Sequence, residues 1–401
     1  MSKFTEIGIS NYYYDFKPSG GRLRESPEDF FVEEKFPELE RKETGNVLIL
    51  KLKARNWEHN RLIRYLARSM GVSPKRIYFA GTKDKRSLKV QYFSIPGAKY
   101  KDIKLEDVDI LDHFYLERPL VTGSHTGNFF RIRVVDCDLD TFRENCERIA
   151  SVKIIPNFYG PQRFGALRPV THLVGRELVK GNYSEATRLF IGFPGNDRFA
   201  KERKKYYDDP DPKSHLREFP QALDLEIKVL KHLVEHPDDN VGAIKELPDN
   251  LVQMFIHAYQ GYLFNMILNK RMSVEKGLMA GDIFHLNEDY MKVTELNMSR
   301  LKKSFEEGKG APTGLVIGYG SEYASGLMGK IEREVVTEEG IEESNFKIPF
   351  GLKSRGERRD LFFSVPDLVC GDGSVEFTLG PGSYATSLIR EITREEKMEN
   401  Y

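Results

Sequence analysis

The sequence of 401 residues contains only three cysteines and one tryptophan, and its 61 Lys and Arg residues are balanced by 61 Asp and Glu residues. Cys137, Cys146 and Cys370 are odd in number and show no paired spacing, so neither a disulfide framework nor a cysteine zinc site is expected. Aliphatic runs are short, the longest covering residues 47–50, and the N-terminus lacks an apolar signal core. We therefore expect a soluble cytoplasmic protein and no membrane partner.

The zero net charge conceals a strong local asymmetry. Between Lys51 and Lys89, twelve Lys and Arg residues accompany two acidic residues, whereas residues 332–343 hold six glutamates and one arginine. This segregation indicates a basic surface and a separate acidic surface. The alternative, a charged surface that stabilises the protein at high temperature, explains the total charge but not its distribution.

Strand-like and helix-like patterns follow one another in the first part of the chain without a strict βαβ rhythm, which predicts an α+β fold. The predicted strands cover residues 30–32, 47–52, 77–80, 90–95 and 129–135, and the predicted helical stripes cover 62–70 and 142–149. A polar loop, residues 81–86, separates two of these strands.

The middle of the chain has a different composition. Residues 199–217 are rich in Lys, Tyr, Asp and Pro, with a loop expected at 208–212, and helical patterns follow at 223–236 and 251–268. The glutamate-rich stretch 332–343 is expected at the surface. We infer an inserted domain at 160–345, within a first domain formed by 1–159 and 346–401.

Two motifs suggest other chemistry. His232, Glu235 and His236 match an inverted zincin pattern, in which two helical histidines bind zinc, so a zinc hydrolase is an alternative function. Pro237 ends the helix at the second histidine, which argues against such a site. The glycine clusters at 81–83 and 371–373 lack the spacing of nucleotide-binding loops, so no nucleotide cofactor is expected.

Asp84 stands in the polar loop between Lys83, Lys85 and Arg86. Neighbouring cations favour the ionised carboxylate, which can serve as a nucleophile or a base. An ordinary solvated turn has the same composition, so the loop alone does not identify a site.

Six segments, in order, cover nearly the whole chain and together resemble the TruD family of tRNA pseudouridine synthases. The loop segment 79–86 (FAGTKDKR), with Gln91 downstream, is similar to the catalytic motif of that family. The other five are 26–34 (SPEDFFVEE) preceded by Arg24, 127–130 (GNFF), 157–165 (NFYGPQRFG), 258–265 (AYQGYLFN) and 382–391 (GSYATSLIRE).

The resemblance implies an enzyme that isomerises uridine, at position 13 of tRNA, without a metal, redox or nucleotide cofactor. It implies a pseudouridine synthase fold, with a central, mostly antiparallel sheet flanked by helices, and an inserted α/β TRUD domain. Asp84 is expected to be the catalytic carboxylate, whether it attacks C6, attacks C1′ or acts through a glycal. The length and the charged composition suggest an archaeal member, and a monomer is expected.

Further site residues are expected from the resemblance and from chemistry. Arg24 is the candidate cation that orients Asp84, and Lys83 is expected to neutralise phosphate or that carboxylate. Asn128 and Phe130 share one side of a predicted strand, where they are expected to contact a flipped-out uracil, although a core phenylalanine is the simpler interpretation of Phe130.

Other residues are expected to contact RNA outside this pocket. Arg61, Arg64 and Arg68 form a helical stripe suited to phosphate contacts, or alternatively a solvated helix face. Gln162 and Arg163 are expected at the cleft between the domains, and Tyr206 and Tyr207 hint at RNA contact. A tRNA-binding protein that has the same scaffold without catalysis is the rival interpretation.

Overall fold

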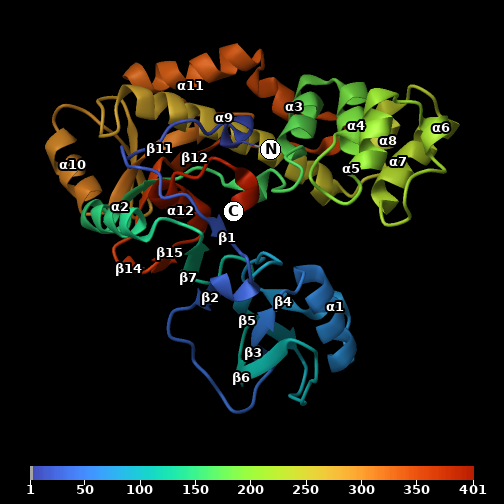
Figure 1. Cartoon of the computed structure of the whole chain (residues 1–401), viewed down its shortest axis with the longest axis horizontal. Helices are drawn as coiled ribbons and strands as arrows, with labels where there is room; N and C mark the ends of the chain where they lie inside the picture. The colour runs from blue at the N-terminus through green and yellow to red at the C-terminus, as the bar shows by residue number, and fades with distance from the viewer. Residues whose placement is uncertain (1–2) are drawn as a thin grey trace. The chain divides into compact units, whose positions relative to one another are not determined.

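The computed structural model describes residues 3–401, which fold into two compact units (Figure 1). The sheet unit consists of residues 16–153, 364–395 and 400–401, and the helical unit consists of the chain up to Asp15 with residues 154–363 and 396–399. The helical unit therefore also takes the chain up to Asp15 and residues 154–159, 346–363 and 396–399, which were expected in the first domain. One reason is strand pairing: β12 (Glu357–Asp360) pairs with β11 (Gly310–Val316) of that unit.

The sheet unit is built on one nine-stranded sheet. Its main path runs β14-β15-β7-β2-β5-β3-β6, while β1 pairs with β7 and β4 pairs with β5. Only the pairing of β2 with β5 is parallel, so the predicted α+β fold with a mostly antiparallel sheet is confirmed. The strands are β1 (Arg22–Leu23), β2 (Phe30–Lys35), β3 (Val47–Arg55), β4 (Tyr78–Phe79), β5 (Leu88–Pro96), β6 (Val108–Leu116), β7 (Gly127–Val135), β14 (Val369–Gly371) and β15 (Ser374–Leu379).

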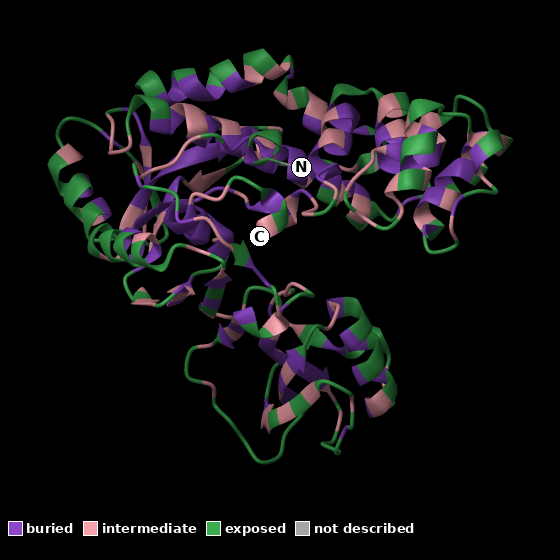
Figure 2. Cartoon of the chain, in the orientation of Figure 1, coloured by how far each residue is buried: buried purple, intermediate pink, exposed green. Residues whose placement is uncertain are grey.

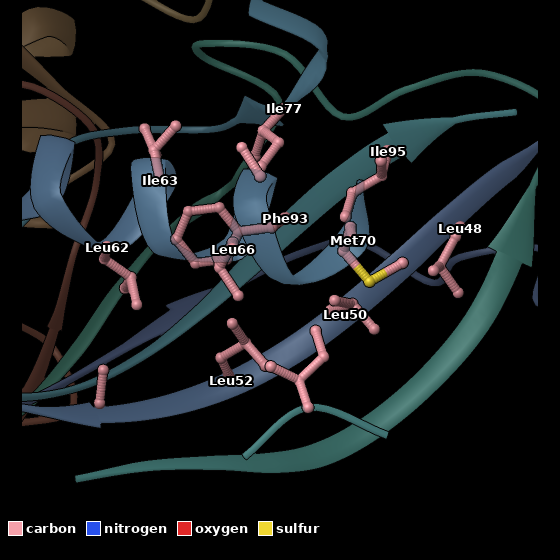
Figure 3. Packing of buried hydrophobic residues seen from close by; sticks show 13 residues of the cluster. Leu48, Leu50, Leu52, Leu62, Ile63, Leu66, Met70, Ile77, Phe93 and Ile95 are labelled. Atoms are coloured by element: carbon pink, nitrogen blue, oxygen red, sulfur yellow. The ribbon is translucent and has the colours of Figure 1, made fainter. Parts of the chain in front are cut away.

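Three helices accompany this sheet: α1 (His59–Met70), α2 (Leu139–Val152) and α12 (Ala385–Thr393). Helix α1 begins where the side chain of Glu58 accepts hydrogen bonds from the backbone N–H groups of Asn60 and Arg61, and it ends at Gly71 in the left-handed conformation, which glycine adopts at no steric cost. The predicted stripe faces the sheet: Leu62 and Leu66 of α1 are buried against Leu50 and other strand residues (Figure 3).

The strand registers define an inner face of this sheet. Leu50 lies opposite Phe93 on β5, Lys89 of β5 lies opposite Val32 on β2, and Val32 lies opposite Phe130 on β7. Because paired residues point to the same side of a sheet, these side chains share one face, and so do those two residues away on each strand. The inner face therefore carries Lys89, Gln91 and Phe93 of β5, Phe30, Val32 and Glu34 of β2, and Asn128, Phe130, Ile132 and Val134 of β7.

Helix α2 is linked to the far end of the same face by a disulfide between Cys146 and Cys370, whose Cα atoms are 6.0 Å apart. Cys370 lies opposite Val375, which lies opposite Ile132 on the inner face. The expectation of no disulfide is therefore wrong for this pair: the two cysteines are 224 residues apart, so no local spacing indicates the bond. Helices α1 and α2 thus cover two ends of the inner face and leave the strands between them for polar residues.

The helical unit surrounds a long buried helix, α9 (Asp249–Val274) (Figure 2). Phe255, Tyr259 and Leu263 of the predicted stripe are buried. Helix α3 crosses α9 so closely that a Cβ on Gly175 would lie 2.0 Å from the backbone oxygen of Phe255, so only glycine fits there. The other helices are α3 (Thr171–Lys180), α4 (Tyr183–Gly192), α5 (Ala200–Asp208), α6 (Pro212–His215), α7 (Asp224–Glu235), α8 (Asn240–Lys245), α10 (Met298–Glu306) and α11 (Gly326–Glu339).

A second, four-stranded sheet of order β10-β9-β11-β12 lies in the helical unit. Its remaining strands are β9 (Ile283–Leu286) and β10 (Asp289–Lys292), and a separate pair joins β8 (Ile154–Pro156) to β13 (Phe362–Ser364). Across residues 3–401, no helix combines the length and apolar character needed to cross a membrane.

The expected surface position of 332–343 is confirmed for Glu334, Glu338 and Glu342, which are exposed, whereas Glu332 is fully buried and pairs with Arg358 of β12. One expectation for this unit needs correction. Tyr206 is buried against Phe219 and is therefore a core residue rather than an RNA contact. The predicted break near 208–212 is confirmed, since α5 ends at Asp208 and α6 begins at Pro212.

We expect Cys370→Ser to lower the free energy of unfolding by about 2–4 kcal/mol, because the disulfide restricts the unfolded chain. Thermal unfolding of protein purified without reductant measures the effect. The control is Cys137→Ser, which removes the cysteine that forms no disulfide. Identical unfolding midpoints for Cys370→Ser, Cys137→Ser and the parent protein would contradict the role assigned to this crosslink.

Candidate active site

The loop that carries Asp84 connects β4 to β5 and is fixed by hydrogen bonds to its backbone. The side chain of Gln91 donates to the carbonyl of Gly81 at 3.0 Å, and the hydroxyl of Ser87 donates to the carbonyl of Asp84 at 2.7 Å. The ammonium of Lys89 also donates to the carbonyl of Asp84, at 3.0 Å. Because Gln91 and Lys89 lie on the inner face of β5, their hydrogen bonds attach the loop to the packed sheet.

Arg24 and Asp84 form an ion pair in which Nη2 of Arg24 lies 2.7 Å from Oδ2 of Asp84. The side chain of Arg24 is only 7% exposed, whereas that of Asp84 is 39% exposed. The guanidinium also lies over the ring of Phe30, 4.1 Å from its centroid. Burial lowers the pKa of Arg24 and the charge of Asp84 opposes that shift. The cation therefore depends on Asp84 for compensation and holds the carboxylate in place.

The backbone of Arg24 is unusual as well. Its φ of 60° lies in the left-handed region, which is uncommon for a residue with a side chain. The carbonyl of Arg24 accepts a hydrogen bond from Nη2 of Arg86 at 2.8 Å, which ties this strained residue to the far end of the Asp84 loop. Two contacts therefore join Arg24 to the Asp84 loop: the ion pair with Asp84 and the hydrogen bond from Arg86 to the backbone carbonyl of Arg24.

Lys83 does not pair with Asp84. Its Nζ lies 2.8 Å from Oε1 of Glu34, a fully buried carboxylate on the inner face. The other oxygen of Glu34 accepts the backbone N–H of Tyr92 at 3.0 Å. The expectation that Lys83 neutralises Asp84 is therefore wrong: its charge neutralises Glu34, which anchors the loop next to Asp84. A contact of Lys83 with phosphate stays a prediction.

Phe130 and Asn128 lie where the inner face stops being closely packed. Ile132 is fully buried and Val134 is 3% exposed, but Phe130 and Asn128 are only half-buried. Phe130 stacks on Phe377 with centroids 5.4 Å apart and meets Phe30 edge to face at 6.0 Å. The predicted shared side of these residues is confirmed. An aromatic wall thus extends from the Arg24–Phe30 contact to Phe130.

Asn128 lies directly opposite Glu34 in the register of β2 and β7. Its Oδ1 is shielded from solvent and has no hydrogen-bond partner among residues 3–401. A buried polar atom of this kind is rare in native proteins, and a ligand that donates a hydrogen bond would satisfy it. Asn128 thus carries an unsatisfied polar atom on the inner face, beside half-buried Phe130.

Sequence reasoning assigned no role to Lys89 and His59. Lys89 is fully buried and also donates to the carbonyl of Trp57. His59 is 6% exposed and lies 4.3 Å from the ring of Phe79, and burial, reinforced by the charge of Lys89, lowers its pKa to about 4. The alternation along β5 places Lys89 on the side of Phe93, a signal that could have identified an inward-facing lysine.

The arginine stripe lies on the solvent side of α1 (Figure 2). Arg61 contacts the rings of Trp57 and Tyr65, with its guanidinium 5.2 and 5.6 Å from their centroids. Within the described chain, Arg61, Arg64 and Arg68 form no ion pair with an acidic residue. The predicted exposed cationic stripe is confirmed, and it carries aromatic side chains as well.

The other predicted residues lie in the helical unit. Gln162 and Arg163 belong to a short 3-10 turn, Pro161–Arg163, with the guanidinium of Arg163 lying 5.6 Å from the ring of Tyr159. Nothing in the structure tests their contact with RNA, which stays a prediction. Phe164, the residue that follows, is fully buried, as expected for a core phenylalanine.

The zincin-like pattern has no metal-site geometry. Helix α7 ends at Glu235, and although the rings of His232 and His236 lie 5.0 Å apart, Nε2 of His232 lies 3.0 Å from Asp239. In the part of the chain that the structure describes, no group of three His, Cys, Asp or Glu side chains is arranged to hold a metal ion.

Comparison with known proteins gives a consistent result. The family model described as tRNA pseudouridine synthase D (TruD) matches residues 6–392. The "Probable tRNA pseudouridine synthase D" of Methanococcoides burtonii is 35% identical, over 98% of both chains, and that of Methanosarcina mazei is 33% identical, over 98% of both. A crystal structure of the TruD homologue from Methanosarcina mazei superposes with a TM-score of 0.80 at 34% identity and covers 98% of each chain.

Lys89 gives the folded protein a specific pH dependence. Burial lowers its pKa from 10.5 to about 8, against the opposing charges of Asp84 and Glu58. Between these values the unfolded chain binds more protons at this residue than the folded chain, so the free energy of unfolding rises with pH, by at most about 1.4 kcal/mol per pH unit. Below pH 8 both states are protonated and the contribution is constant.

We therefore expect the stability of the parent protein, measured relative to Lys89→Met, to increase from pH 8 to pH 10. Urea unfolding at pH 7, 8, 9 and 10 measures this difference. The control is Lys53→Met, because Lys53 lies on the adjacent strand β3 and is more exposed than Lys89. Parallel curves for the parent protein and Lys89→Met would show that the pKa of Lys89 is not lowered by folding.

Proposed function

Because this chain belongs to the TruD family of tRNA pseudouridine synthases, we propose that it isomerises uridine 13 of tRNA to pseudouridine with Asp84 as the carboxylate that acts on the substrate. The reaction breaks the bond between N1 and C1′ and forms a bond between C5 and C1′, while C5 loses a proton and N1 gains one. The observation that carries the role of Asp84 is its pairing with buried Arg24 beside the rings of Phe30 and Phe130.

The geometry suits a reactive carboxylate. Arg24 binds one oxygen of Asp84, and the other oxygen, Oδ1, has no hydrogen-bond partner among residues 3–401. A carboxylate held at one oxygen and partly exposed has a second oxygen that can approach a substrate. The backbone contacts from Ser87 and Lys89 fix its position, which reduces the entropy lost on reaching the reactive arrangement.

Uridine inside folded RNA must leave its stack before a side chain can reach its sugar or base. Phe130 offers an aromatic face that can contribute about 1–3 kcal/mol by stacking on an extruded base. If the side chain of Asn128 turns so that its Oδ1, which is now shielded from solvent, faces the pocket, this oxygen would accept the N3–H of uracil, a donor that cytosine lacks at that position. Together they would hold the detached uracil while it turns to present C5.

We assign the two units to the two domains expected from the family. The sheet unit would be the catalytic pseudouridine synthase domain, since it contains Asp84, Arg24, Asn128 and Phe130, and the helical unit would be the inserted TRUD domain. Gln162 and Arg163 of the helical unit are proposed to contact tRNA. We also propose that the enzyme works as a monomer in the cytoplasm, where its substrate is found.

Asp84→Asn should abolish pseudouridine formation and leave the dissociation constant for tRNA within a few-fold of the parent value. Asparagine retains an oxygen that can accept from Arg24 but cannot act as a nucleophile or base. Carbodiimide labelling with primer extension on transcribed tRNA measures product at position 13, and a transcript with cytidine at that position is the substrate control. Equal losses of binding and turnover would instead assign Asp84 to RNA docking.

The same assay on the parent protein decides between an enzyme and a non-catalytic tRNA-binding protein. Binding of tRNA without pseudouridine at any position would favour the binding protein.

The exposed stripe of α1 should contribute to tRNA affinity through phosphate contacts. We expect each single alanine substitution of Arg61, Arg64 and Arg68 to weaken binding several-fold and to reduce the slope of log affinity against log salt by about 0.7–0.9, with little change in kcat at saturating tRNA. Arg143→Ala is the matched control, because Arg143 is an exposed arginine of α2 that pairs with Asp372. A solvated helix face without a role in binding would give the same affinity and slope for all four variants.

A further inference from the structure

A hollow of about 600 Å³ opens on the four-stranded sheet of the helical unit, a unit that does not contain Asp84. This volume lies within the range of about 300–1,000 Å³ that is typical of small-molecule sites. Its walls come from β9, β10, β11 and β12 and from the loop of residues 317–325 that joins β11 to α11. None of the residues given a role in the proposed reaction lines it.

The strand registers explain why the hollow exists. Lys292 of β10 lies opposite Ile283, and Leu315 of β11 lies opposite Arg358, and all four line the hollow. On the other side of the sheet, a Cβ on Gly314 would lie 3.2 Å from the ring of Phe264 of α9, so that side is covered by a helix. The side with Lys292 and Arg358 remains accessible.

At the floor of the hollow lies the guanidinium of Arg358, whose position is fixed by several contacts. Arg358 is 9% exposed and pairs with the fully buried Glu332 at 2.6 Å. Its guanidinium also donates to the carbonyl of Thr313 at 2.6 Å and to the hydroxyl of Thr313 at 3.0 Å. The second oxygen of Glu332 accepts the backbone N–H of Ala324 at 2.8 Å. The floor and the loop above it are therefore held together by one buried carboxylate.

The loop of residues 317–325 approaches its neighbours so closely that glycine is required. A Cβ on Gly356 would lie 2.4 Å from Oγ of Ser321, and one on Gly318 would lie 2.5 Å from the backbone of Arg355. The loop leads into the N-terminus of α11, where the hydroxyl of Ser325 donates to the carbonyl of Gly281 instead of capping the helix. The backbone N–H groups of Gly318, Ser321 and Ala324 donate to side chains of the protein, so the loop is held in one conformation beside the hollow.

The side chains around this floor provide three kinds of contact. Lys292 and Arg355 are exposed and form no ion pair within residues 3–401, so their charges are available to a phosphate. Tyr290 stacks on His285, with centroids 4.8 Å apart, and remains 53% exposed, so a second planar ring can contact it. Tyr323 is held by Arg333, whose guanidinium lies 4.8 Å from its ring.

Two carboxylates complete the lining. Glu322 and Glu357 are exposed, and across the described chain neither carboxylate accepts a hydrogen bond or forms an ion pair. Carboxylates beside a phosphate-binding set would weaken the binding of a simple anion. They suit a ligand that also carries hydrogen-bond donors, such as the exocyclic amino group of a nucleobase.

We propose that this hollow is a second nucleotide-binding site, which takes a nucleoside phosphate whose base carries an exocyclic amino group. Lys292 and Arg355 bind the phosphate, a tyrosine ring stacks on the base, and Glu322 or Glu357 accepts from the amino group. The ligand is an unpaired adenosine, cytidine or guanosine of the bound tRNA, a source that rests on the proposed function, whereas the same chemistry would also bind a free nucleotide.

Binding of mononucleotides to the full-length protein tests the site independently of catalysis. Isothermal titration with AMP and CMP should give saturable binding at least about 5-fold tighter than with UMP, since uracil has no amino group. Replacing both Lys292 and Arg355 by alanine should weaken AMP binding about 10-fold or more, since both phosphate contacts are lost. Lys302→Ala, on exposed α10 outside the hollow, should leave it unchanged. Preference for UMP, or no effect of the double variant, would overturn the proposal.

The source of the nucleotide is tested with tRNA. Ultraviolet crosslinking of the Asp84→Asn protein to transcribed tRNA, followed by mass spectrometry, should place a ribonucleotide adduct on a peptide that contains Tyr290 or Tyr323. Adding the Lys292 and Arg355 substitutions to the Asp84→Asn protein should abolish this adduct and weaken tRNA binding several-fold. In the protein that retains Asp84, the same two substitutions should leave kcat at saturating tRNA unchanged. AMP binding without an adduct supports the site and assigns it to free nucleotide. If the protein neither binds AMP nor forms the adduct, the proposal is refuted.

The test remains valid if the proposed reaction is wrong. Lack of pseudouridine formation by the parent protein would refute the catalytic function but would not affect AMP binding or the adduct. Lys302→Ala again serves as the control for a nonspecific effect of removing positive charge.

Discussion

The site depends on the ion pair between Arg24 and Asp84. A buried guanidinium without a partner would be strongly unfavourable, so Arg24 requires a carboxylate, and the 2.7 Å contact supplies it. The same arginine adopts a left-handed backbone and covers the ring of Phe30. These features together fix a short polar loop that its own composition would leave mobile.

Two further lysines stabilise the loop from the inner face of the sheet. Lys83, in the loop, forms an ion pair with the buried Glu34 of β2, and Lys89 of β5 donates a hydrogen bond to the carbonyl of Asp84. Apolar packing would give more stability at these positions, because buried charges lose their hydration. The retention of charge here indicates that position matters more than stability, and this is consistent with a loop that presents a reactive group.

A similar arrangement occurs in the helical unit, where Glu332 neutralises the buried Arg358 and holds the backbone of Ala324. In both units a carboxylate that is fully buried fixes a cation and a loop together. In the sheet unit the loop carries Asp84, and in the helical unit it borders the hollow. The protein thus uses one kind of buried ion pair to hold a loop beside a sheet in both units.

Local sequence determined the identity of the reactive loop and of the elements around it, β2, β3, β4, β5, β7, α1 and α2, whereas most of the other strands and helices were not predicted. Periodicity located α1 through Leu62, Leu66 and Met70, alternation placed Phe130 with Ile132, and the motif around Asp84 identified the loop, because these signals depend only on neighbours in the chain. Contacts between distant residues were decided by the tertiary structure alone. Cys146 meets Cys370, Lys83 pairs with Glu34 and Glu332 pairs with Arg358, because in each case a helix or a loop packs against a strand that is distant in the chain, and no local pattern encodes that packing.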